Sequence, residues 1–343
     1  MDTQIITNPS EQELDMLASA LRNGELVSIP TETVYGLGAN GLDPEAMDKI
    51  YAAKGRPSDN PLILHVPNSE SIKPLVTEVS NTAQLLMDTF WPGPLTITLP
   101  KSDLVPDRAT GGLPRVALRC PDHKVCRALL ERAGVPVAAP SANISGRPSP
   151  TTAQDVYHDM NGRISYILDA GPCTIGVEST VVEVHDDKVI ILRPGGITKA
   201  QLEAVVSTVE YDTALVNATT KPKAPGMKYT HYAPDAPMTV VVGSPEKVAS
   251  TFKELSEGIE GPIGCLVSHE TYNLMKEDTR FIFHCFGNYG DALSLGHDFY
   301  KSLLYFNENH VALILAEGVD DDGFGVAIMN RMEKASSHHI IYK

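Results

Sequence analysis

The chain has 343 residues, of which 42% are hydrophobic and 21% are charged, and its formal net charge is −15. The length favours two domains, and the composition is that of an ordinary globular protein. The negative charge argues against broad electrostatic binding of nucleic acid, because such binding relies on clustered cations.

The cysteine pattern bears on the redox environment. The five cysteines are an odd number and show no CxxC spacing, so neither a disulfide framework nor a zinc site is expected. Buried free thiols in a reducing compartment are the favoured interpretation. No apolar run has the length of a membrane span and the first residues lack the pattern of a signal peptide, so we expect a cytoplasmic protein without a membrane partner.

Strands and helices alternate over the first two hundred residues. Ser10 opens a capping-box pattern, and apolar residues then recur at helical spacing until Gly24. Asp43 followed by Pro44 marks a second helix start. We expect strands over 26–29, 62–66, 95–99, 115–119 and 136–139, a helix over 123–132, a hairpin of 179–184 with 188–192, and a helix capped by Thr198. This alternation predicts the α/β class, with a twisted mixed sheet and covering helices.

The regular pattern lapses from about 209 to 236. Residues 221–226 are rich in proline, but 227–234 contain two tyrosines and a histidine, which a plain spacer does not need. The alternation then resumes, with strands over 238–242, 263–267 and 311–316 and helices over 245–256, 292–306 and 326–336. This pattern predicts a smaller Rossmann-like α/β domain, although its first strand-to-helix loop lacks the GxGxxG fingerprint of a dinucleotide site.

Four polar fragments directly follow predicted strands or helices, where an α/β protein places its ligand-binding loops. They cover residues 30–38, 54–57, 141–143 and 193–196. Three of them carry the glycines, cations and hydroxyl groups that a phosphate-bearing ligand requires. Walker, GxSxG and HExxH patterns do not occur in the sequence, which argues against P-loop chemistry and common hydrolases.

Two of these fragments also have plainer interpretations. Lys54 and Arg56 suit a polyphosphate, or they are solvated cations that complement the dipole at a helix end. The Thr-Glu-Thr run at 31–33 could bind the ammonium group of an amino acid or a metal, or it is a capping and turn segment. The residues alone leave both pairs of alternatives open.

Two side chains on predicted strands are candidates of a different kind. His65 lies at a strand end, where a histidine is more often structural than catalytic. Arg119 alternates with apolar neighbours, so it needs a carboxylate or phosphate partner. That partner is either a ligand or an acidic residue such as Glu178 or Asp169.

In order and spacing, these fragments resemble the two-domain form of the L-threonylcarbamoyladenylate synthase family, whose N-terminal part has the YrdC-like fold. The matching motifs are PTETVYGL at 30–37, KGRP at 54–57, SAN at 141–143, RPG at 193–195 and APGMKYTHYAP at 224–234. The resemblance implies a YrdC-like catalytic domain over 1–207, a linker over 208–236 that closes as a lid over the active site, and a C-terminal Rossmann-like domain over 237–343.

The resemblance also implies an activity. The family makes threonylcarbamoyl-AMP and pyrophosphate from L-threonine, bicarbonate or CO2, and ATP, with Mg2+ accompanying ATP as the cofactor. The product serves the N6-threonylcarbamoyladenosine (t6A) modification at position 37 of tRNAs that read ANN codons. We therefore expect a nucleotidyltransferase that hands its product to the tRNA threonylcarbamoyl-transferase machinery and has at most a weak RNA contact of its own.

By resemblance, the site residues fall into three groups. The family's paired KxR and SxN signature, expected to carry the catalysis, is intact as Lys54, Arg56, Ser141 and Asn143. The residues expected to bind L-threonine are Thr33, His65, Arg119, Ala139 and Ser179. The residues expected to bind ATP are Arg56, Asn60, Arg115, Ser141, Ser149, Arg193 and Tyr232, while the metal ligands are not identified.

Two other function classes are alternatives. YrdC-like domains are also linked to double-stranded RNA through a basic concave face, but a net charge of −15 disfavours a large RNA footprint. A different carbamoyl- or adenylyl-transfer enzyme, as in hydrogenase maturation, usually carries acylphosphatase and zinc-finger segments. The CxxC pairs of such a segment do not occur in this sequence.

Overall fold

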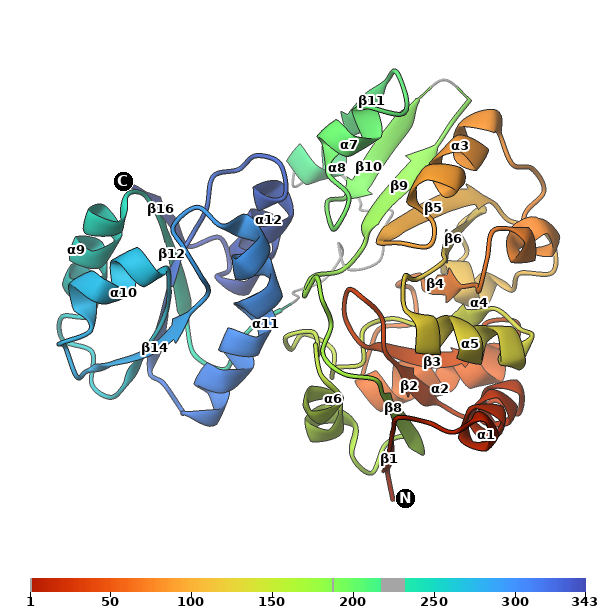
Figure 1. Ribbon diagram of the computed structural model, residues 1–343, viewed down its shortest axis with the longest axis horizontal. Coiled ribbons are helices and arrows are strands. Elements are labelled where there is room, and N and C mark those ends of the chain that lie inside the picture. The colour runs from red at the N-terminus through yellow and green to blue at the C-terminus, as the bar shows by residue number, and fades with distance from the viewer. Residues whose placement is uncertain (1, 187, 217–231) are drawn as a thin grey trace. The chain divides into compact units, whose positions relative to one another are not determined.

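The computed structural model describes residues 2–186, 188–216 and 232–343. These residues form two compact units, each built on its own sheet (Figure 1). The first unit contains the chain up to residue 216 except for 146–148 and 175–177, which group with the second unit.

The first unit is built on an eleven-stranded mixed sheet in the order β1-β8-β2-β3-β7-β4-β6-β5-β9-β10-β11. Neighbouring pairs are parallel in some places, such as β4 with β6, and antiparallel in others, such as β5 with β6. The strands are β1 (Gln4–Thr7), β2 (Val27–Ile29), β3 (Gly36–Asn40), β4 (Ile63–His65), β5 (Leu95–Pro100), β6 (Arg115–Arg119), β7 (Val137–Ala138), β8 (Tyr166–Asp169), β9 (Thr180–Val184), β10 (Val189–Arg193) and β11 (Val209–Tyr211).

The helices of this unit begin where the capping chemistry predicts. Ser10 and Glu13 form the expected capping box, and the side chains of Asp43 and Thr198 cap α2 and α7. The helices are α1 (Glu11–Arg22), α2 (Pro44–Lys54), α3 (Asn81–Phe90), α4 (Asp107–Thr110), α5 (Lys124–Ala133), α6 (Ala153–Met160), α7 (Lys199–Glu203) and α8 (Thr213–Val216), with a 3-10 helix η1 over Glu70–Leu75.

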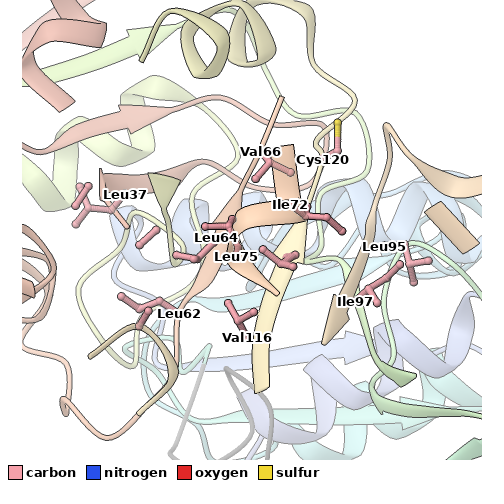
Figure 2. Close-up of a cluster of buried hydrophobic side chains, with 14 of the residues drawn as sticks. Leu37, Leu62, Leu64, Val66, Ile72, Leu75, Leu95, Ile97, Val116 and Cys120 are labelled. Carbon is pink, nitrogen blue, oxygen red and sulfur yellow. The ribbon is translucent and has the colours of Figure 1, made fainter. Parts of the chain in front are cut away.

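Large apolar cores hold this sheet and its helices together. One core contains Leu17 and Leu21 of α1 with Leu129 and Leu130 of α5, packed on residues of β2 and β7. The larger core gathers the apolar side chains of β4, β5 and β6 with those of η1, as Figure 2 shows for Leu64 and Ile72. Burial of apolar surface on this scale fixes which strand ends reach the same edge of the sheet.

One loop assignment from the sequence is wrong in part. Residues 36–38, expected within a polar loop, belong to β3, which pairs antiparallel with β2. The glycines there serve close packing, because a Cβ on Gly38 would lie 2.9 Å from both Val27 O and Val137 Cγ1. The loop proper is therefore shortened to residues 30–35.

The structure describes only part of the predicted linker over 208–236. Its first residues form β11 and α8, where the sequence predicts no regular structure. β11 pairs in parallel with β10, so this stretch extends the first sheet. Residues 217–231, with most of the aromatic motif, lie outside the described residues.

The second unit is a five-stranded sheet in the order β14-β13-β15-β12-β16, and each of its strand pairs is parallel. Val248, Phe252 and Leu315 contribute to its core. Its elements are β12 (Met238–Val242), α9 (Pro245–Leu255), β13 (Ile263–Val267), α10 (His269–Met275), β14 (Phe281–Cys285), α11 (Ala292–Glu308), β15 (Leu313–Glu317), α12 (Gly325–Ala335) and β16 (Ile340–Tyr342). The expected mixed α/β sheet followed by a smaller Rossmann-like domain is confirmed.

Two further expectations concern cysteines and membrane segments. All five cysteines are free thiols; four are buried, and Cys285 is half-buried. Among the residues that the structure describes, the helices are too short or too polar to traverse a bilayer.

Candidate active site

The register of the first sheet brings several predicted site residues to one edge. His65, the last residue of β4, is paired with Arg119, the last residue of β6. β5 runs antiparallel to β6 and parallel to β9, so the starts of β5 and β9 lie at the edge where β6 ends. Ser179 immediately precedes β9. His65, Arg119 and Ser179 therefore share this edge.

Arg119 is buried at this edge and has a carboxylate beside it. Its side chain is 4% exposed, and its Nη2 lies 2.7 Å from Oε2 of Glu32. Its Nη1 donates to Thr33 Oγ1 at 2.9 Å, and its Nε donates to the carbonyl of Gly93 at 3.3 Å. An acidic residue is thus a partner of Arg119, but it is Glu32 and neither Glu178 nor Asp169, which the sequence suggested.

The loop of residues 30–35 presents Glu32 and Thr33 to Arg119. Thr31 Oγ1 accepts the backbone N–H groups of Thr33 and Val34, at 3.1 and 3.2 Å, so the turn interpretation is correct at Thr31. The capping interpretation is wrong, because strand β3 follows the loop rather than a helix. The carbonyl of Glu32 accepts from the N–H of Thr174 at 3.1 Å, which fixes the loop from the other side.

His65 is held in the neutral form. Burial, together with the adjacent charge of Arg119, lowers the pKa of His65 to about 3. Its Nδ1 lies 3.2 Å from the carbonyl of Ile63, which also accepts the N–H of Ala139 at 3.0 Å. A histidine that stays neutral at physiological pH can orient a hydroxyl group, but it is no general acid in that range.

Ser179 is fixed by a third buried group, Arg193. Arg193 Nη2 donates to the carbonyl of Ser179 at 2.9 Å and to its hydroxyl at 3.2 Å. The Ser179 hydroxyl also lies 2.7 Å from Thr96 Oγ1. The sequence predicts Arg193 and Ser179 as separate ligand contacts, whereas the structure joins them directly and adds Thr96, which only the strand register reveals.

Lys54 links the two halves of the KxR and SxN signature. It ends α2, its side chain is buried, and its Nζ donates to the carbonyls of Ser141 and Asn143, the second at 2.6 Å. Asn143 Oδ1 lies 3.5 Å from the same nitrogen. Burial lowers the pKa of Lys54 well below its usual range. The interpretation of Lys54 as a solvated cation at a helix end is therefore wrong. We name Lys54, Ser141 and Asn143 the lysine clamp.

The lysine clamp adjoins the loop that serves Arg119. The N–H of Ala142, inside the SxN motif, donates to the carbonyl of Tyr35 at 2.9 Å. Ser141 also forms a bridge with Gly36 at the start of β3. One loop thus contacts Arg119 through Thr33 and the clamp region through Tyr35, which places both predicted subsites side by side.

The predicted nucleotide contacts Asn60, Arg56 and Ser149 differ in their hydrogen-bond partners. Asn60 is 1% exposed, and within the described residues neither atom of its carboxamide has a hydrogen-bond partner. Arg56 Nη2 donates to the carbonyl of Pro61 at 3.2 Å. Ser149 donates to Glu178 Oε1 at 2.7 Å. A buried amide without partners costs free energy, so Asn60 is suited to a polar ligand.

Arg115, a predicted ATP contact of the same unit, is not brought to this edge. Arg115 starts the strand that Arg119 ends, and four residues of strand span about 13 Å. Arg115 donates to the carbonyls of Thr98 and Val184, at 2.8 and 2.7 Å, and lines a separate cavity of about 110 Å³. Tyr232 belongs to the second unit, where its ring centroid lies 5.2 Å from that of Tyr300. The ligand roles of both stay predictions.

In the described parts of the chain, no three side chains among His, Cys, Asp and Glu are grouped so that they could hold an ion. The expectation that Mg2+ accompanies ATP stays a prediction.

Comparisons with known proteins cover both units. A family model described as "Telomere recombination" matches residues 19–195, and one described as "Threonylcarbamoyl-AMP synthase, C-terminal domain" matches residues 197–337. The threonylcarbamoyl-AMP synthase of Bacillus subtilis is 46% identical over 333 residues, which cover 97% of this chain and 95% of the relative. The protein of that name from Pyrococcus abyssi is 43% identical over 335 residues, 96% of each chain.

The fold comparison agrees with these matches. The crystal structure of P. abyssi Sua5 complexed with L-threonine superposes with a TM-score of 0.90 at 40% identity. The superposition covers 99% of this chain and all of the other. The similarity therefore extends over both units and over the edge that carries Arg119.

Proposed function

This chain belongs to the threonylcarbamoyl-AMP synthase family of ATP-using adenylyl transferases, and from that premise we propose that it joins L-threonine, bicarbonate or CO2, and ATP into threonylcarbamoyl-AMP and pyrophosphate. The observation that carries the proposal is the buried Arg119, surrounded by polar groups at an edge shared with Ser179 and adjoining the SxN motif. A guanidinium in that setting suits a small carboxylate.

In this proposal the amino acid lies at Arg119. The guanidinium holds the carboxylate, and Thr33, His65, Ser179 and the backbone of Ala139 surround the remainder. A relative was crystallised with L-threonine, which supports an amino acid as ligand of this fold. The neutral His65 supports a hydroxyl partner, because an uncharged imidazole both donates and accepts hydrogen bonds.

ATP lies beyond the amino acid, toward the SxN motif. We propose that Arg56, Asn60, Ser141, Ser149 and Arg193 contact the nucleotide, and that Arg115 and Tyr232 are further contacts. The carboxamide of Asn60 supports this placement, since a donor and an acceptor remain buried without partners among the described residues. Lys54 and Asn143 hold the loop on which Ser141 lies.

The chemistry has two steps. The ammonium group of threonine first loses a proton to solvent. The resulting amine attacks CO2, so a C–N bond forms and a second proton leaves to solvent. A carbamate oxygen then attacks the α-phosphorus of ATP, and the P–O bond to the pyrophosphate breaks. Such steps need alignment and neutralised charge rather than a protein nucleophile, and Mg2+ bound to the phosphates supplies part of that charge.

Membership of the family supports a proposal for how the product is used. We propose that threonylcarbamoyl-AMP passes to the tRNA threonylcarbamoyl-transferase machinery for t6A at position 37 of tRNAs that read ANN codons. Direct RNA contact is expected to be weak, because the chain carries a net charge of −15. We also propose a cytoplasmic location, where the enzyme has access to its substrates.

The test is pyrophosphate release by the purified chain with Mg-ATP, bicarbonate and L-threonine. Release should require all three and should fall strongly when L-valine replaces L-threonine, because the hydroxyl contact is then lost. Arg132→Ala serves as a control, since Arg132 pairs on the surface with Glu11 and Asp15. Pyrophosphate release that does not depend on threonine would refute the proposal.

A further inference from the structure

We propose that Glu32 binds the α-ammonium group of the amino acid, so that Glu32 and Arg119 together form a site for a zwitterion. This inference rests on the proposed function, because it names how the amino acid of that reaction is held. The side chains of Glu32 and Arg119 are 7% and 4% exposed, and Glu32 Oε2 lies 2.7 Å from Arg119 Nη2. We call them the carboxylate–guanidinium pair.

The first step concerns what Glu32 has left to bind. An ionised carboxylate has about four acceptor positions on its two oxygens. Oε2 faces Arg119 as an ion pair, but within the described residues neither Oε1 nor Oε2 receives a hydrogen bond of normal geometry. A buried carboxylate in that state is stabilised by any donor that arrives, and an ammonium group is a strong one.

The second step concerns what Arg119 has left to give. Its Nε and Nη1 donate to Gly93 and Thr33, and its Nη2 faces Glu32. A guanidinium carries five N–H donors, and two of them form these hydrogen bonds. At least two therefore remain for a substrate carboxylate, even with one N–H turned toward Glu32. In an α-amino acid one carbon separates the ammonium from the carboxylate. The guanidinium of Arg119 and the carboxylate of Glu32 are in direct contact, so they match the short spacing between the two charges of the ligand.

The third step concerns selectivity. Arginine alone would attract any anion, including bicarbonate and the phosphates of ATP, which the reaction also needs nearby. With Glu32 beside it the site is neutral overall, and His65 adds no charge because burial keeps it unprotonated. The salt bridges among the described residues pair Glu32 with Arg119 and with no second cation. An anion without an ammonium group is thus repelled by Glu32, whereas a zwitterion is bound at both ends.

The test compares L-threonine with (R)-3-hydroxybutanoate, which keeps the carboxylate and the β-hydroxyl but lacks the ammonium group. Calorimetric titration of the wild-type chain should show L-threonine binding about 10- to 100-fold more tightly, as a charged hydrogen bond predicts. In Glu32→Gln the ratio should fall below about threefold, with the hydroxybutanoate bound as well as before or better.

The outcomes separate the possibilities. An unchanged ratio in Glu32→Gln overturns the inference, and so does an equal loss for both ligands, because Glu32 would then only position Arg119. Glu32→Asp, which keeps the charge, should give an intermediate ratio and covers the case in which Glu32→Gln fails to fold. Glu183→Gln removes another buried carboxylate of the same sheet and should leave the ratio unchanged. A wild-type chain that does not bind L-threonine refutes the proposed function itself.

Discussion

Lys54 and Arg119 are both buried basic side chains of the first unit, but they differ in what their donors contact. Lys54 directs its ammonium group at oxygens of Ser141 and Asn143, so it fixes one loop. Arg119 faces Glu32, whose oxygens lack normal hydrogen bonds among the described residues, and it retains donors of its own. The comparison teaches that burial of a charge near a site does not identify a ligand contact; the donors and acceptors left over do.

The strongest challenge to this comparison is Arg119→Ala. We expect threonine-dependent pyrophosphate release to fall at least about a hundredfold, because charge-assisted hydrogen bonds to the carboxylate are lost. The free energy of unfolding should also fall by roughly 3–5 kcal/mol, since Glu32 is left buried without its partner. Pyrophosphate assays and urea denaturation measure the two effects.

A double variant separates those two effects. Replacing the pair by Arg119→Met with Glu32→Leu should recover most of the stability, because apolar side chains of similar size fill the space without a buried charge. Activity should not return. If it does, the carboxylate–guanidinium pair is structural only.

The second challenge is Lys54→Met. The carbonyls of Ser141 and Asn143 lose their donor, so the free energy of unfolding should fall by roughly 2–4 kcal/mol. Affinities for ATP and L-threonine should weaken together, since the loop that adjoins both subsites is released. Denaturation and calorimetric titration measure these effects.

The control for Lys54 is on the same helix. Lys49 is exposed and donates to the carbonyl of Gly24, so Lys49→Met should cost less than about 1 kcal/mol. Full stability of Lys54→Met with a selective loss of ATP affinity would contradict the clamp and make Lys54 a phosphate ligand.

The last challenge concerns His65 and pH. Its folded pKa of about 3 lies below the usual 6.5, so between these values the unfolded chain binds the extra proton. The stability that His65 contributes is complete above about pH 6.5 and declines as the pH falls, by at most about 1.4 kcal/mol per pH unit. His65→Gln should flatten this decline in denaturation curves. An imidazole NMR titration of His65 with a midpoint near pH 6.5 would contradict the neutral assignment and add a charge beside Arg119.

Much of the fold was predictable because its signals are local. The capping box at Ser10 and Glu13 involves residues three apart, and the hairpin of β9 with β10 follows from two adjacent apolar runs. Elements without such signals escaped prediction. β3 begins with glycines that resemble a turn, and β11 lies in a stretch that reads as linker. Their pairing with β2 and β10 supplies the stability that their own residues do not indicate.

The candidate site was likewise predictable only in part. The sequence by itself supplied the residue types at strand ends, the family motifs, and the need of Arg119 for an anionic partner. Only the tertiary structure chose Glu32 over Glu178 and Asp169, and joined Lys54 to Ser141 across 87 residues of chain. Caps and strand periodicity depend on neighbours within a turn or two, whereas these contacts depend on strand order and register, which the packing of the whole sheet decides.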